Sequence, residues 1–75
     1  MEEISFQLQP GKLFIPLDQL LKLTGMANSG GEAHKIIQEG VVMVNDQVEM
    51  QKRKKMKAGD TAVLDDVRIT VTSEA

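Results

Sequence analysis

Apolar and polar residues alternate at both ends of the chain, which is the pattern of half-buried β-strands. At residues 4–8, "ISFQL" alternates with period two, and the Pro-Gly pair at 10–11 predicts a turn after it. We expect "KLFI", residues 12–15, to return as the hairpin partner of this first strand. At residues 67–71, "VRITV" alternates in the same way and predicts a last strand with one apolar face.

Between these ends, the spacing of apolar residues changes twice to that of a helix. After Pro16, the apolar residues Leu17, Leu20 and Leu21, followed by Thr24, fall at positions i, i+3, i+4 and i+7, which predicts a helix over 16–24 that ends at Gly25. Asp18 and Lys22 are four residues apart on the expected outer side, where they would form an ion pair.

The second helix carries stronger local signals. Ser29 and Glu32 have the spacing of a capping box, in which each side chain accepts a hydrogen bond from the backbone of the other residue. An apolar stripe follows, and Gly40 suits the left-handed conformation that ends a helix. The pattern predicts a helix over 30–39. Its outer face presents His34, Lys35 and Gln38.

From residue 41 onward the period returns to two, which predicts short strands and turns. "VVMV" and "VEM" are expected to form a hairpin around the turn "NDQ", since Asn and Asp tolerate positive φ. "AGD" and "DD" predict further turns around "TAVL". The whole pattern indicates an α+β fold, with two packed helices against a small, mostly antiparallel sheet.

Length and composition set limits on this fold. The 75 residues have room for one small core, so we expect a single domain over 1–75. The absence of cysteine excludes disulfides and thiolate metal sites. The longest apolar run has four residues, and the start of the chain is acidic, so neither a membrane span nor a signal peptide fits. We expect a soluble, cytoplasmic protein.

Charge is distributed very unevenly. The sequence "KRKKMK" at residues 52–57, here called the basic segment, holds five of the nine basic residues of a chain whose net charge is -2. If the segment is extended, Lys52, Lys54 and Met56 lie on one side, and Met56 is the side chain that turns inward. Neighbouring cations repel one another unless an anion lies opposite. Such a segment therefore suits a polyanionic partner.

Three other interpretations of the basic segment stay open. It can be a solvated edge strand whose lysines prevent aggregation, or a nuclear localisation signal. It can also contact an acidic protein partner, which the negative net charge of the chain favours.

Nucleic acid fits the basic segment better than a membrane does, because these cations do not lie on an amphipathic helix. The chain has no Trp or Tyr, and its two phenylalanines, Phe6 and Phe14, lie at expected core positions. Base stacking is therefore disfavoured. Recognition of the phosphates and shape of a folded RNA is the mode that remains, ahead of duplex DNA.

The segment "SGGEAHKIIQEGVVMVND", followed by "KAGD", resembles the signature of the RNA-binding domain named after small-subunit ribosomal protein S-four. "PLDQLLKLTGM" is similar to the first helix of that family. The resemblance covers residues 15–64, and "SGGEA" together with the short chain is most similar to small stand-alone members of the YaaA type. It implies an alpha-L motif, in which RNA binds across the second helix and the strands that follow.

The resemblance also implies the residues of the RNA site. The expected contacts are Gly30, His34, Lys35 and Gln38 on the second helix, and Lys52, Arg53, Lys54 and Lys55 on the basic segment. Positions 30, 34 and 38 are often basic in the family, so the basic segment would supply charge that this helix lacks. Ser29, Gly30 and Gly31 add backbone N–H groups at a helix N-terminus, where a phosphate can bind.

No arrangement of residues indicates an enzyme. The single histidine, with no cysteine beside it, does not make a metal site, and Asp65-Asp66 is explained by a turn. No nucleophile and base can be paired. We therefore expect a monomeric, non-catalytic protein without cofactor that binds structured RNA, either ribosomal RNA or transfer RNA, and acts at the ribosome or in its assembly.

Overall fold

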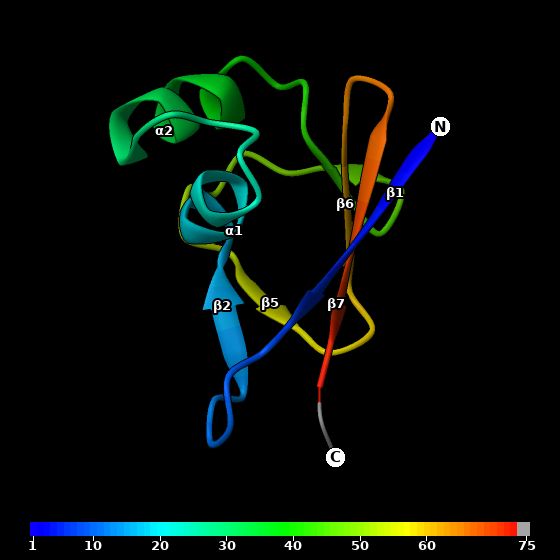
Figure 1. Cartoon of the computed structure of the whole chain (residues 1–75). Helices are drawn as coiled ribbons and strands as arrows, with labels where there is room; N and C mark the ends of the chain where they lie inside the picture. The colour runs from blue at the N-terminus through cyan, green and yellow to red at the C-terminus, as the bar shows by residue number, and fades with distance from the viewer. Residues whose placement is uncertain (74–75) are drawn as a thin grey trace.

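The computed structural model describes residues 1–73, so the last two residues of the expected 1–75 domain lie outside it. Two helices lie beside two small sheets (Figure 1). The helices are α1 (Leu17–Leu23) and α2 (Gly30–Gln38). The strands are β1 (Glu2–Gln7), β2 (Phe14–Pro16), β3 (Met43–Val44), β4 (Gln47–Val48), β5 (Lys55–Lys57), β6 (Thr61–Leu64) and β7 (Val67–Thr72). The predicted α+β class, with packed helices and a mostly antiparallel sheet, is confirmed.

The larger sheet has five strands in the order β1-β7-β6-β3-β4. All of its pairings are antiparallel except that of β1 with β7, which is parallel and places Ile4 opposite Ile69. This pairing covers the edge that β7 would otherwise leave open to solvent. The first and last strands of the described chain therefore lie side by side in one sheet, and the N-terminus lies beside the start of β7 (Figure 1).

The predicted hairpin between residues 4–8 and 12–15 is wrong. After β1 the chain leaves the large sheet, and β2 pairs antiparallel with β5 in a separate two-stranded ribbon. In that ribbon Ile15 lies opposite Met56, and both side chains are buried. A local hairpin with β1 would leave Met56 without this partner, so burial of apolar area favours the distant pairing.

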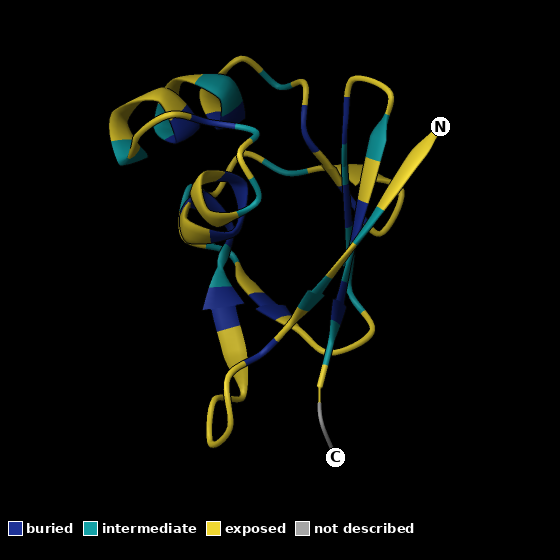
Figure 2. Ribbon diagram, viewed as in Figure 1, coloured by how far each residue is buried: buried dark blue, intermediate teal, exposed yellow. Residues whose placement is uncertain are grey.

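One core joins the helices to both sheets (Figure 2). Helix α1 contributes Leu17, Leu20 and Leu21, as its apolar spacing predicts, and α2 contributes Ala33 and Ile37. The sheets close the core from the other side with Met56, Ala62, Ile69 and Val71. The helix pair and the ribbon therefore have fixed positions relative to each other.

Two predicted turns are confirmed. Asn45 and Asp46 have φ angles of 51° and 69°, which is the pattern of a type I′ hairpin turn between β3 and β4. Asp65 also has positive φ in the turn between β6 and β7. Within residues 1–73 no helix is long and apolar enough to cross a membrane.

Candidate nucleic-acid interface

The basic segment consists of a turn and a strand. Lys52 and Arg53 form the turn, and β5 begins at Lys55, so the segment is extended only in its second half. The expected alternation of burial is nevertheless present. Met56 is fully buried, whereas Arg53, Lys55 and Lys57 are exposed and Lys52 and Lys54 are half-buried. One buried methionine therefore anchors a surface on which three cations point to solvent.

The backbone of the basic segment is bonded to the first turn of α1. The N–H of Leu17 donates to the carbonyl of Lys54 at 2.8 Å, and the N–H of Asp18 donates to the carbonyl of Lys52 at 3.0 Å. Pro16, which precedes the helix, offers no side-chain cap. These carbonyls therefore satisfy two helix N–H groups that would otherwise lack partners, and the basic segment is fixed against α1.

The cations of the basic segment form no salt bridge within residues 1–73, although Asp60 lies close enough to Lys54 and Lys57 for their charges to interact. Within residues 1–73 the salt bridges are His34 with Asp18 and Arg68 with Glu3, so none involves residues 52–57. Instead, Lys55 Nζ lies 5.1 Å from the centroid of the Phe14 ring, a cation–π contact. The charge of the segment is therefore available to an external anion.

Phe14 is not a core residue, so the expectation that it lies in the interior is wrong. Its side chain is 39% exposed, on the opposite face of β2 from the buried Ile15. Phe6 is half-buried and packs against the core, close to expectation. Because neighbouring strand residues point to opposite faces, burial of Ile15 forces Phe14 outward onto the face that it shares with Lys55 and Lys57.

Asp60 follows β5 and bonds both to this strand and to the β3–β4 hairpin. Its carboxylate accepts hydrogen bonds from the N–H of Lys57 at 2.8 Å and from Nδ2 of Asn45 at 3.1 Å. Burial opposes its ionisation, but these two bonds and the positive charges of Lys57 and Lys54 outweigh burial and hold the pKa of Asp60 below its ordinary value. Asn45 also accepts from the N–H of Thr61. Asn45 and Asp60, both within the signature, therefore have a structural role here.

The N-terminus of α2 is capped largely as predicted. Ser29 Oγ accepts from the N–H of Glu32 at 3.2 Å, but the Glu32 carboxylate accepts from the N–H of Asn28, at 3.2 Å, and not from Ser29. The side-chain amide of Asn28 donates to the same carboxylate. Gly30 is half-buried and Gly31 exposed beside it. This helix end thus already faces a negative charge.

Asp18 lies between the helices and not on the outer side of α1, so that expectation is wrong. It is only 4% exposed, and its Oδ2 is 2.8 Å from Nε2 of His34 on α2. Within residues 1–73 its side-chain partner is His34 and not Lys22. The cause is that α2 covers this part of α1, which the periodicity of one helix cannot reveal. His34 is correspondingly half-buried, whereas Lys35 and Gln38 are exposed as expected.

Asp18 connects the two groups of predicted RNA contacts. Its backbone N–H bonds to Lys52 in the basic segment, and its side chain bonds to His34 on α2. The turn of the basic segment and the middle of α2 are therefore attached to the same residue. The predicted positions of two residues of this surface, Asp18 and Phe14, are wrong. For Phe14 the sequence did contain a signal, because Phe14 precedes Ile15 in the same strand and neighbouring strand residues point to opposite faces.

The fold and this surface together define an S4 domain. Residues 8–72 match the family model of the S4 domain, and the chain belongs to that family. YbcJ of Escherichia coli (strain K12) is 47% identical over 47 residues, which covers 63% of this chain and 67% of YbcJ. YbcJ of Shigella flexneri matches to the same extent.

A solved structure of a relative extends the similarity to the whole fold. The solution structure of YbcJ from E. coli superposes with a TM-score of 0.69 and 37% sequence identity, covering 91% of this chain and 85% of that chain. That structure is described as revealing an alpha-L motif involved in RNA binding. The family resemblance drawn from the signature residues is thus confirmed.

Within residues 1–73, no group of three or more His, Cys, Asp or Glu side chains is placed to hold a metal ion.

Proposed function

We propose that this protein binds structured RNA, ribosomal RNA or transfer RNA, through the basic segment and the adjoining surface of α2, and that it acts without catalysis. The observation that carries the proposal is the set of five basic side chains in residues 52–57, which form no salt bridge with residues 1–73 and whose backbone is fixed against α1. A fixed array of unpaired cations suits phosphates held at fixed spacing in folded RNA.

The family supports RNA as the ligand. The chain belongs to the S4 domain family, and YbcJ, which shares its fold, is described as having a motif involved in RNA binding. Ribosome assembly or translation is the process that we propose for it, in the cytoplasm and as a monomer. Folded RNA is the proposed ligand because the cations of residues 52–57 suit phosphate contacts, which position a protein on RNA without reading its sequence.

The two parts of the site contribute differently in this proposal. Lys52, Arg53, Lys54 and Lys55 supply the charge, whereas Lys35 and Gln38 contact the RNA from α2. His34 holds α2 against Asp18 and so positions the helix surface; a direct contact of its ring with RNA stays a prediction. Ser29, Gly30 and Gly31 stay predicted contacts as well, and there a phosphate would have to compete with the Glu32 carboxylate.

The test is ultraviolet crosslinking in cells, followed by sequencing of the attached RNA. Wild type is compared with the variant Lys52→Ala/Arg53→Ala/Lys54→Ala/Lys55→Ala, which keeps the backbone carbonyls that bond to α1. Lys22→Ala/Arg68→Ala is the control because it removes cations outside the site. Enrichment of one structured RNA that is lost only in the fourfold variant supports the proposal. Recovery of no RNA above background by folded wild-type protein contradicts it.

A second candidate is that the basic segment binds an acidic protein. The observation in its favour is the net charge of -2, which repels RNA from the remainder of the surface. Nuclease treatment of a cell extract separates the two. A partner complex that survives removal of RNA supports the acidic protein, and a complex that dissolves supports RNA.

A further inference from the structure

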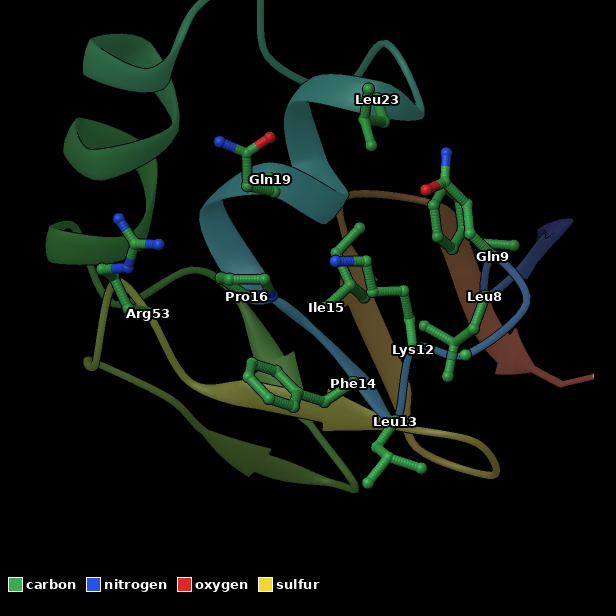
Figure 3. A pocket seen from close by; sticks show the side chains of 12 residues that line it. Leu8, Gln9, Lys12, Leu13, Phe14, Ile15, Pro16, Gln19, Leu23 and Arg53 are labelled. Carbon is green, nitrogen blue, oxygen red and sulfur yellow. The ribbon is translucent and has the colours of Figure 1, made fainter.

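A groove lies between α1 and β2, next to the basic segment (Figure 3). It has a volume of about 610 Å³ and lies mainly between apolar side chains. Its lining includes Gln19 and Leu23 from α1, and Leu13, Phe14 and Ile15 from β2 and the residue before it. Lys12 and Arg53 also line the groove, so it combines apolar side chains with two cations.

The apolar walls of this groove are unusually open to solvent. Leu13 is 83% exposed and Leu23 is 60% exposed, although both are large aliphatic side chains. Leu13 and Phe14 also line a second depression, together with Lys54, Lys55 and Lys57 and with Asn45 and Asp60. These two apolar side chains therefore lie between a mainly apolar surface and one that is rich in cations. The interior of the fold does not use these side chains, since its core is complete without Leu13 and Leu23.

The combination of surfaces matches the chemistry of one nucleotide. A nucleobase has two apolar faces and polar edges, and its phosphate is attached at a short, fixed distance. The walls of the groove offer apolar contact for the faces, the Gln19 amide can bond to an edge, and Arg53 or Lys55 can bind the phosphate. An acyl chain would use the walls but leave Gln19 without a partner, and an acidic peptide would use the cations alone.

We propose that this groove receives one unpaired base of the bound RNA, a site that rests on the proposed RNA-binding function and names the structural class of its ligand. The RNA is then a stem with a bulged or flipped-out nucleotide and not a continuous duplex. Base stacking is disfavoured only if both phenylalanines lie in the core, and the exposed position of Phe14 removes that objection.

Lys55 has a part in this site. Its ammonium nitrogen lies over the Phe14 ring when no RNA is present. Lys55 lines the second depression and not the groove, so a base that contacts Phe14 from the groove leaves the cation–π contact in place. The same ammonium can then form a charge-assisted hydrogen bond with the phosphate of the same or the next nucleotide.

The experiment uses purified full-length protein and two RNA probes. One probe is an RNA stem with a single unpaired uridine, and the other is the same stem without it. Affinities are measured for wild type, Leu23→Ser, Phe14→Leu and the control Val48→Ser, which replaces a side chain of similar exposure on β4. Ultraviolet crosslinking and mass spectrometry then locate the uridine on the protein. The tryptic peptide 13–22 contains Leu13, Phe14 and Ile15.

We expect wild type to bind the stem with the unpaired uridine about tenfold more tightly, as the stacking of one base predicts. Leu23→Ser and Phe14→Leu should lose this preference while keeping their affinity for the paired stem, and Val48→Ser should keep both. The crosslink should lie in peptide 13–22. Equal affinities of wild type for both stems, or a preference that survives both groove variants, would overturn the groove site and leave RNA binding intact. If wild type binds neither stem, the proposed function fails and the groove site fails with it.

Discussion

The helix pair and the β2–β5 ribbon use their polar groups in opposite ways. On the helices, Asp18 bonds to His34, and Ser29 and Asn28 bond to Glu32, so both acidic side chains of α1 and α2 are bonded within the fold. On the ribbon, the lysines of β5 form no salt bridge with residues 1–73, and Met56 is the one buried residue of that strand. The helices therefore hold the surface in place, and the basic segment, which includes β5, supplies most of its positive charge.

The difference explains how an acidic chain can have a cationic site. Carboxylates near the helices are occupied by hydrogen bonds, and Asp60, the acidic group nearest to the lysines, is bonded to the Lys57 backbone and Asn45. Asp60 thus fixes the structure and offsets part of the charge of Lys54 and Lys57, while the five basic residues of the segment outnumber it. Net charge alone would have given the wrong sign for this surface.

The largest expected effect is the loss of RNA affinity when positive charge is removed from the basic segment, compared with its removal from α2. The variant Lys52→Ala/Arg53→Ala/Lys54→Ala/Lys55→Ala should lose roughly a hundredfold to a thousandfold in RNA affinity, because about four phosphate contacts disappear. Lys35→Ala on α2 should lose at most about fivefold. Binding of the RNA recovered from cells, measured between about 50 and about 200 mM salt, should weaken about a hundredfold for wild type and hardly at all for the fourfold variant. Equal losses of RNA affinity for the fourfold variant and for Lys35→Ala would contradict the conclusion that the basic segment supplies most of the charge.

Truncation of Met56, the buried residue of β5, is expected to have the next largest effect. Met56→Ala should lower the free energy of unfolding by about 3 kcal/mol, since it leaves a cavity under the basic strand. Met43→Ala is the control because Met43 is partly exposed on β3, and its cost should stay below about 1 kcal/mol. Urea denaturation measures both. A Met56→Ala variant as stable as the control would mean that the ribbon does not depend on this contact.

Breaking the polar contact between the helices should have an intermediate effect. His34→Ala leaves the buried Asp18 carboxylate without its side-chain partner, which we expect to cost about 1–3 kcal/mol of unfolding free energy. Gln38→Ala, at an exposed position of the same helix, should cost little. Thermal denaturation distinguishes the two variants. If they unfold at the same temperature, the Asp18 contact does not hold the helices together.

The smallest expected effect concerns pH and the Asp60 link. Because the folded pKa of Asp60 lies below its ordinary value, the ionised carboxylate stabilises the fold above the ordinary pKa, and this stabilisation disappears as the pH falls through the lowered pKa. Solvent screening keeps the contribution below about 1 kcal/mol. Asp60→Asn should therefore flatten the acid limb of a stability curve, whereas Asp66→Asn in the exposed turn should not. An unchanged acid limb for Asp60→Asn would contradict the assignment.

The sequence predicted what local signals determine. Helix α2 was found to within one residue because a cap, an apolar stripe and Gly40 all lie within its own segment. The turn at Asn45 and Asp46 was found for the same reason. The burial of Met56 followed from alternation within six residues.

Contacts between distant segments were the ones that the sequence did not predict. Strand β1 pairs with β7, at the other end of the chain, and no local pattern distinguishes this partner from the nearer "KLFI". Asp18 is buried because α2 lies over it, which depends on the angle between two helices. The groove beside Phe14 likewise requires α1, β2 and the basic segment to be assembled before it exists.

The bonds from α1 to the carbonyls of Lys52 and Lys54 have an evolutionary consequence. Every amino acid carries a backbone carbonyl, so these attachments do not depend on which side chains occupy the two positions. Mutation can therefore change the charge, size or hydrogen-bonding capacity of the turn while its anchoring persists. A protein with this fold can therefore adapt to a different nucleic acid by substitution of a few exposed residues, while the turn stays attached to α1.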